Sequence, residues 1–196
     1  MVLASHIIFS TYGFWLPNDP RGSWSDFVRN WDLFLQGGPA RKVSVRHSIA
    51  KQPHDRRAKQ YGKDALRFNP VRFTGIQARS VATGFRKAVA ESQYDVLACS
   101  IMPDHVHMVV ARHENAAERI IGHLKARATQ QLVADDLHPF VELRDERGRF
   151  PSVWANSAWK VFLNSQTDID RAIRYVRDNP LKEGKPLQKW SFVKTV

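Results

Sequence analysis

Cysteine is almost absent from this chain of 196 residues, and the chain contains no long apolar run. The one cysteine, Cys99, excludes an internal disulfide framework and a cysteine-based zinc cluster, and we expect it to be a small core residue. No apolar stretch approaches the roughly 18 residues of a membrane-spanning helix. The N-terminus lacks the charged start and the small-residue cleavage site of a secretory signal. We therefore expect a cytoplasmic protein with no membrane partner.

Acidic side chains are scarce relative to basic ones. The chain carries 30 Lys or Arg against 19 Asp or Glu, which gives a formal net charge of +11. Such an excess favours a polyanionic partner, with nucleic acid ahead of an anionic membrane surface. The length suits one sizeable core, so we expect a single domain over residues 1–196, present as a monomer or a homodimer.

Two histidines occupy alternate positions in the segment Met-Pro-Asp-His-Val-His-Met-Val-Val, residues 102–110. Side chains alternate between the faces of a strand, so His105 and His107 share one face and Val106 lies on the other. Neutral imidazole is the commonest metal ligand, and the pair can begin a divalent metal site. It can equally be a pair of sheet histidines hydrogen-bonded to neighbours. Asp104 is typical of a turn residue, and its nearness to the histidines leaves open a hydrogen bond to a metal ligand. His6 is either a core histidine or a residue that supports the metal-binding histidines from behind.

Hydrophobic periodicity and capping patterns place the other elements. We expect strands over 3–12, 94–102, 105–112 and 158–163, and helices over about 75–92, from 115 onward and over 167–180. This order predicts an α+β fold, the ferredoxin-like sandwich, in which helices cover one face of an antiparallel sheet. The last helix is additional to that fold. Because the first and third strands are then central neighbours, the last helix can cover the face that carries the histidines.

The last predicted helix has two distinct faces. Its apolar stripe consists of Ile169, Ala172, Ile173 and Val176. By contrast, Arg171, Tyr175 and Asn179 are spaced by four residues and share a polar face. The core therefore does not require Tyr175. If this helix covers the open face of the sheet, Tyr175 and Asn179 lie near the two histidines.

A basic insertion is expected at about residues 15–73. Between positions 17 and 74 there are twelve Lys or Arg and five Asp, a net charge of +7. Trp15, Trp24 and Trp31 are interleaved with Arg21 and Arg29. Bases stack on exposed aromatic rings while cations track phosphates, so this mixture suits single-stranded nucleic acid. The same residues also suit a small helical subdomain whose tryptophans form its own core, and the sequence leaves both interpretations open.

Three stretches together resemble the single-tyrosine HUH transposases of the IS200/IS605 type, and especially the REP-associated tyrosine transposases. They are Met102-Pro-Asp-His-Val-His-Met, Tyr175-Val-Arg-Asp-Asn-Pro and Phe9-Ser-Thr-Tyr-Gly-Phe-Trp-Leu-Pro. The resemblance implies that His105, His107 and Asn179 bind a divalent metal, Mg²⁺ or Mn²⁺. It also implies that Tyr175 is the nucleophile. The basic insertion departs from the compact core of that family.

The function implied by the resemblance is metal-dependent nicking and strand transfer of single-stranded DNA that carries a hairpin, through a 5′-phosphotyrosine intermediate. Two alternatives are a domesticated protein that binds DNA hairpins without cleavage and a metal-dependent hydrolase that uses water. The basic and aromatic residues expected to contact DNA are Arg21, Trp24, Arg29, Lys125, Arg127, Arg171, Lys182, Lys185 and Lys189.

Overall fold

The computed structural model describes residues 1–23, 25–43, 49 and 52–194. It separates the chain into two compact units, which are described here one at a time. Unit 1 consists of residues 1–11 and 72–196, and unit 2 of residues 12–71. The boundaries of unit 2 lie within a few residues of those expected for the basic insertion.

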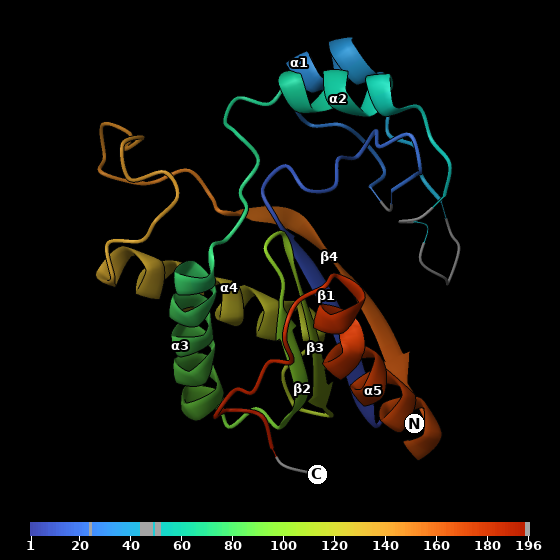
Figure 1. Cartoon of the computed structure of the whole chain (residues 1–196), viewed down its shortest axis with the longest axis vertical. Helices are drawn as coiled ribbons and strands as arrows, with labels where there is room; N and C mark the ends of the chain where they lie inside the picture. The colour runs from blue at the N-terminus through green and yellow to red at the C-terminus, as the bar shows by residue number, and fades with distance from the viewer. Residues whose placement is uncertain (24, 44–48, 50–51, 195–196) are drawn as a thin grey trace. The chain divides into compact units, whose positions relative to one another are not determined.

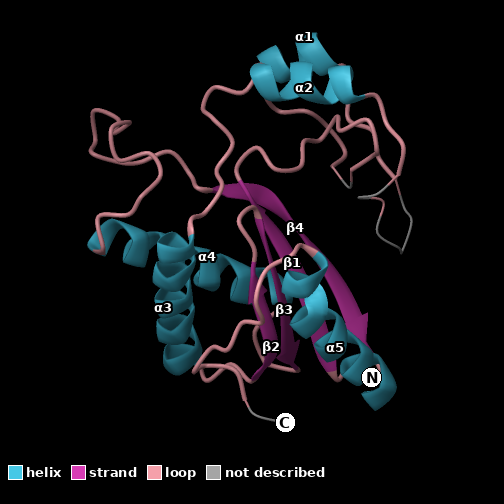
Figure 2. Ribbon diagram, viewed as in Figure 1, coloured by secondary structure: helices cyan, strands magenta, loops and turns pink. Residues whose placement is uncertain are grey.

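Unit 1 is built on a four-stranded antiparallel sheet (Figures 1 and 2). Its elements are β1 (Ala4–Thr11), α3 (Gly75–Ser92), β2 (Val96–Ile101), β3 (His105–Ala111), α4 (Ala117–Ala134), β4 (Trp154–Leu163) and α5 (Gln166–Lys182). The strand order is β2-β3-β1-β4, and every neighbouring pair is antiparallel. This is the order of the ferredoxin-like sandwich, so the predicted fold class is confirmed.

Helices α3 and α4 pack on one face of the sheet. The ring of Phe9 in β1 makes an edge contact with Phe85 of α3, with 6.0 Å between centroids. At Gly84, α3 approaches α4 so closely that a Cβ atom would lie 2.5 Å from the Cα of Ala128. The predicted capping box of α3 is present, with Thr74 and Gln77 each bonding the backbone of the other.

Helix α5 packs on the opposite face. Ile169, Ala172, Ile173 and Val176 are buried in one cluster with Ala4, Ala98, Val109 and Leu163 of the sheet. The register pairs Ile8 with His107 and Ser10 with His105. Because side chains alternate along β1, His6 projects from the same face as the two histidines of β3. The face of the sheet that carries these histidines is therefore the face on which α5 packs.

Several element ends differ from the predictions. Helix α4 begins at Ala117, because Asn115 donates its backbone N–H to His113 and Ala116 takes the cap position without a side-chain bond. Helix α5 begins at Gln166 with Ser165 as its cap, and it continues through Pro180 to Lys182. A proline in the last turn removes only its own N–H from the helix, so the turn can persist.

The C-terminal tail of unit 1 follows the outer edge of β2. Gln188 bonds both backbone groups of Ile101 through its amide, accepting at 2.8 Å and donating at 2.9 Å. Val193 forms a parallel bridge with Val96, and the backbone N–H of Lys194 donates to the Val96 carbonyl at 2.8 Å. The edge strand is therefore paired with this tail.

Unit 2 contains two short helices, α1 (Trp31–Gly37) and α2 (Arg56–Asp64). Leu33 is the buried residue of α1, and it lies near Gly62 of α2, where a Cβ atom would be 3.6 Å from its Cδ1. Trp15 donates its indole N–H to the carbonyl of Gly22 at 2.8 Å. Across the described residues of both units, no helix has the length and apolar character needed to cross a membrane.

Candidate active site

The polar face of the sheet brings three predicted site residues into ring contact. The ring centroids of His105 and His107 are 4.9 Å apart, and those of His107 and Tyr175 are 5.5 Å apart. His6 joins this group, with 5.9 Å between its ring centroid and that of Tyr175. Central strands β1 and β3 position the imidazoles, and α5 positions the phenol above them.

His6 contacts His107 at the Nδ1 edge of its ring. Nε2 of His6 lies 3.0 Å from Nδ1 of His107 in a buried contact. Burial lowers the pKa of His6 to about 4. Burial also lowers the pKa of His107 well below its usual value, assisted by the charges of His105, His6 and Lys182. Both rings are therefore neutral at neutral pH, and one of the facing nitrogens donates while the other accepts.

His105 is held by a carboxylate. Its Nδ1 lies 2.8 Å from Oδ1 of Asp104, whose Oδ2 accepts a hydrogen bond from Nη1 of Arg72 at 3.0 Å. Burial raises the pKa of Asp104, but the hydrogen bond from His105 and the charges of His105 and Arg72 outweigh it, so the pKa is below its usual value. The sequence favours a turn residue at Asp104 and leaves open a hydrogen bond to a metal ligand, because Asp104 adjoins His105 in the chain. The structure shows a contact between Asp104 and His105.

Asn179 is buried on α5, one turn beyond Tyr175. Among the described residues, its side-chain nitrogen Nδ2 has no hydrogen-bond partner. A buried amide with an unsatisfied end is costly, and a 180° rotation of the amide would present its oxygen at the same place. Two imidazoles and one amide oxygen form a donor set that suits Mn²⁺ and can serve Mg²⁺.

No group of three or more His, Cys, Asp or Glu side chains within the described ranges could hold a metal ion. A metal site that used the two histidines would need a further ligand of another type, and an amide oxygen such as that of Asn179 is one such type.

Tyr175 is accessible from solvent. Its exposed fraction is 40%, and it lines a depression of about 510 Å³ along α5 together with Arg171, Arg174 and Lys182. The Nζ atom of Lys182 lies 4.2 Å from the centroid of the phenol ring. Burial raises the pKa of Tyr175, and the charge of Glu183 raises it further, so the phenol is protonated at neutral pH.

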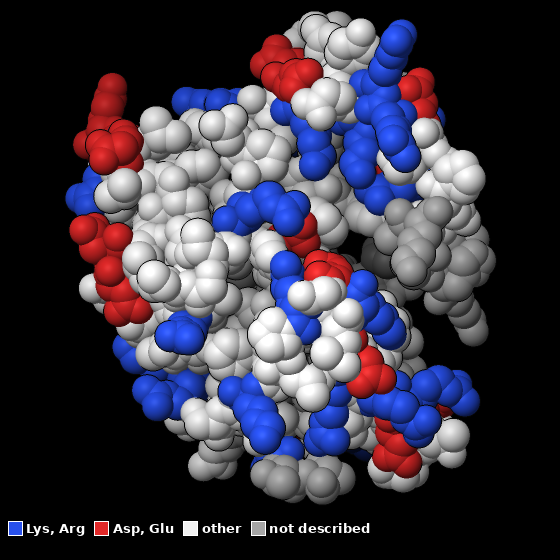
Figure 3. All heavy atoms as spheres, viewed as in Figure 1, with Lys and Arg blue, Asp and Glu red and all other residues white. Residues whose placement is uncertain are grey.

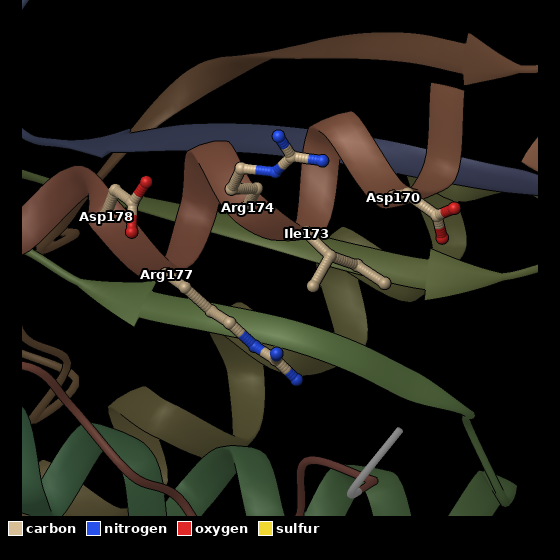
Figure 4. Close-up of a pocket in the computed structure, with 5 residues that line it drawn as sticks. All are labelled: Asp170, Ile173, Arg174, Arg177 and Asp178. Carbon is tan, nitrogen blue, oxygen red and sulfur yellow. The ribbon is translucent and has the colours of Figure 1, made fainter. Parts of the chain in front are cut away.

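The outer side of α5 adds further charge beside the tyrosine. Figure 4 shows Asp170, Arg174 and Asp178 in a row along the helix, with Arg177 extending to one side. Together with Ile173 they line a second depression of about 260 Å³. Arg174 and Arg177 were not among the residues expected to contact DNA. Arg174 lies four residues from both Asp170 and Asp178, and this helical spacing indicates that the three side chains share a face.

The predicted DNA contacts of unit 1 lie in different environments. Lys125 is largely buried and donates to the carbonyl of Ala155 at 2.7 Å. Arg127 forms an ion pair with Glu91 at 2.7 Å. The remaining predicted contacts, Arg171, Lys182, Lys185 and Lys189, lie on α5 and in the tail that follows it, and Lys185 is the one that is only partly exposed.

The predicted contacts of unit 2 are also separated from one another. The side chain of Arg21 is buried, pairs with Asp19 at 2.7 Å and lies over the ring of Trp15. Arg29 is exposed and lies over the ring of Phe27, with 5.0 Å from its guanidinium carbon to the centroid. Trp24 lies outside the described residues.

Residues 70–179 match the family model described as "Transposase IS200 like". A protein from Haemophilus influenzae, provisionally named a REP-associated tyrosine transposase, is 24% identical over 114 residues. That alignment covers 56% of this chain and 64% of the relative, so the chain matches less than two thirds of the relative's length.

Two solved structures are also similar to this chain, at lower sequence identity. A REP-associated tyrosine transposase bound to a REP hairpin gives a TM-score of 0.48 with 10% identity, over 93% of this chain and 68% of that one. A provisionally assigned transposase from Deinococcus radiodurans R1 gives a TM-score of 0.40 with 12% identity, over 96% of this chain and 94% of that one. The family match spans more than half of the chain and includes His105, His107, Tyr175 and Asn179. The chain therefore belongs to the IS200-like transposase family.

Proposed function

We propose that the protein nicks single-stranded DNA and transfers the cut strand, with Tyr175 as the nucleophile. The observation that carries this proposal is the position of Tyr175, whose ring centroid lies 5.5 Å from that of His107 on the face that also carries His105. A solvent-accessible phenol beside neutral imidazoles on a rigid sheet suits attack on a phosphodiester that is held nearby.

His105, His107 and Asn179 would hold a divalent ion, Mg²⁺ or Mn²⁺. When bound, the ion would neutralise charge on the phosphodiester oxygens and help to orient the group. The protein side supports this assignment in two ways. His6 and Asp104 each engage the Nδ1 atom of one histidine, as an outer partner does for a histidine that binds a metal through Nε2. The unsatisfied amide end of Asn179 provides a third polar group on the same side of the sheet.

The chemical step is a transesterification. The phenol oxygen of Tyr175 forms a bond to phosphorus and gives up its proton, and the bond from phosphorus to the 3′ oxygen breaks. The leaving 3′ oxygen takes up a proton and becomes a hydroxyl. The 5′ phosphate remains linked to the tyrosine, so the energy of the broken ester is retained. Attack by another 3′ hydroxyl reverses the step and joins two strands without an external energy source.

The substrate that we propose is single-stranded DNA carrying a hairpin, as in the family that the sequence resembles. Support comes from the net charge of +11 and from the exposed cations Arg171 and Lys182 beside Tyr175. Figure 3 shows further Lys and Arg side chains on the viewed surface of unit 1. We propose a cytoplasmic enzyme, monomeric or homodimeric, in which unit 2 is an insertion into the catalytic domain.

The test is to incubate the protein with end-labelled hairpin DNA and Mn²⁺ and to resolve the products on a denaturing protein gel. We expect a covalent adduct with the wild type and none with a variant in which His105 and His107 are both changed to Ala. This variant should still bind DNA, since the sheet and the basic surface remain. Binding without cleavage would favour a domesticated hairpin-binding protein, and cleavage without an adduct would favour a hydrolase that uses water.

A further inference from the structure

Helix α1 of unit 2 exposes an aromatic surface. The side chains of Trp31 and Leu35 are 67% and 62% exposed, whereas the buried residue of the helix is Leu33. The rings of Trp31 and Phe34 stack with 5.5 Å between centroids and an interplanar angle of 14°. Since Trp31 remains so exposed while one side of its indole contacts Phe34, its other side is open to solvent.

The surroundings of this stack are basic. Residues 12–71 carry eleven Lys or Arg and five Asp, a net charge of +6. Arg29 is exposed one residue before the N-cap of α1, over the ring of Phe27. Helix α2 adds the exposed residues Arg56 and Arg57. Figure 3 shows Lys and Arg side chains gathered around the two helices of this unit.

Trp15 differs from Trp31 because its ring and its indole N–H both have partners within unit 2. Trp15 uses its indole N–H internally, and its ring is covered by Arg21, which in turn pairs with Asp19. This tryptophan therefore stabilises the loop that contains it. The sequence does not distinguish Trp15 from Trp31, whereas the structure separates an internal tryptophan from an exposed one.

We propose that Trp31 and Phe34, with Arg29, form a stacking site for the bases of single-stranded DNA. The proposal deepens the proposed function by naming where unstacked bases bind. Every base has a π face, so an open indole binds bases with little regard to sequence, while a nearby guanidinium binds phosphate. Charge favours this occupant over a second copy of the chain, because two units of net charge +6 repel each other.

The test measures binding without cleavage. A labelled, unstructured oligothymidine is titrated with protein in EDTA, and the affinity is read by fluorescence anisotropy. We expect Trp31→Ala to weaken binding about tenfold and Phe34→Ala by a smaller factor, with Trp31→Phe restoring most of the loss. Phe162→Ala is the matched control, because Phe162 is an exposed aromatic residue of β4 with an exposed fraction of 56%. The Phe162→Ala protein should bind the oligothymidine with the affinity of the wild type.

Salt dependence separates stacking from charge. Trp31→Ala should lower the affinity without changing the slope of log affinity against log salt, whereas Arg29→Gln should reduce the slope by about 0.7, the value for one phosphate on a single strand. Wild-type affinity in a Trp31→Ala protein that melts normally would overturn the proposal. It would also be overturned if the wild type sedimented as a dimer and Trp31→Ala as a monomer, while the two proteins bound DNA with equal affinity. Because EDTA prevents the covalent step, a failure here is distinct from a failure to form the tyrosine adduct.

Discussion

Nε2 of His6 and Nδ1 of His107 face each other at 3.0 Å across the central strands of the sheet. For Nε2 of His107 to act as a ligand, its Nδ1 must carry the proton and donate to His6. His6 then carries its own proton on Nδ1. The tautomers of the two buried rings are therefore linked, and His6 would set the state that the proposed metal binding by His107 requires.

We expect His6→Ala to lower the affinity for Mn²⁺ about 10- to 100-fold, the usual effect of losing an outer-shell partner. The affinity is measured by calorimetric titration of the metal-free protein. His6→Gln, whose amide oxygen can accept from His107, should recover part of the loss. Equal Mn²⁺ affinity in wild type and His6→Ala would show that the link is not needed.

Asp104 should act on His105 in the same manner. Asp104→Ala removes the acceptor of the His105 Nδ1 proton, so Mn²⁺ affinity should fall about tenfold in the same titration. Arg72→Ala is the control, because the Arg72 side chain is 68% exposed and its pair with Asp104 is screened by solvent. Its effect should be much smaller. A larger loss for Arg72→Ala than for Asp104→Ala would contradict this arrangement.

Tyr175→Phe removes the proposed attacking oxygen and nothing else from the exposed side of α5. Adduct formation should be lost, while metal affinity and DNA binding stay within about twofold of wild type. With the wild type, DNA labelled on the 3′ side of the cut should migrate with the protein, and DNA labelled on the 5′ side should be released. An adduct in the Phe variant would move the nucleophile to another tyrosine.

Lys125 provides a pH-dependent stability test. Burial lowers the pKa of its ammonium to about 8 in the folded protein, below the ordinary value of 10.5. Between these values the unfolded chain binds more protons than the folded one, so the free energy of unfolding rises with pH across this window. We expect the wild type to gain about 2–3 kcal/mol from pH 8 to pH 10.5 relative to Lys125→Met, measured by urea unfolding. Parallel pH profiles for the two proteins would be the contrary result.

Gly84 tests the close approach of α3 and α4. A Cβ atom at this position would lie 2.5 Å from the Cα of Ala128 and 2.6 Å from the carbonyl oxygen of Arg127. Gly84→Ala should therefore lower the free energy of unfolding by about 1–3 kcal/mol, despite the better helix propensity of alanine. Gly122→Ala on α4 meets no atom within 4 Å and should instead stabilise by about 0.5–1 kcal/mol. Chemical denaturation of the two variants gives opposite shifts if the packing is as described.

The sheet and its helices could be predicted because local signals agreed with the global order. Alternation placed His105 and His107 on one face, and the Thr74–Gln77 pattern located the start of α3. The family resemblance rested on the same histidines and on Tyr175, and the family match over residues 70–179 confirms it. These features depend on spacing along the chain, which a sequence displays directly.

Other features depend on where a side chain finds its partner. Lys125 and Arg21 look like solvent-exposed cations in the sequence, yet one donates to a backbone carbonyl and the other pairs with Asp19 under an indole ring. The contact from Asp104 to His105 depends on rotamers, and the bond from His6 to His107 depends on strand register. The contacts of Lys125 with Ala155 and of His6 with His107 join residues far apart in the chain, so no local pattern encodes them. The contacts of Asp104 with His105 and of Arg21 with Asp19 join near neighbours, but the sequence does not specify the rotamers that form them.

The tail that pairs with β2 limits how this sheet can associate. An edge strand with free N–H and C=O groups is a template for another chain. Gln188 satisfies both groups of Ile101, and Val193 and Lys194 occupy the edge at Val96. The tail therefore occupies both ends of the β2 edge, and it would have to leave before a second copy of unit 1 could extend the sheet there. With the tail in place, such an extension would have to use β4, the other outer strand. Deletion of the tail would expose unpaired backbone N–H and C=O groups on β2, where another chain could pair.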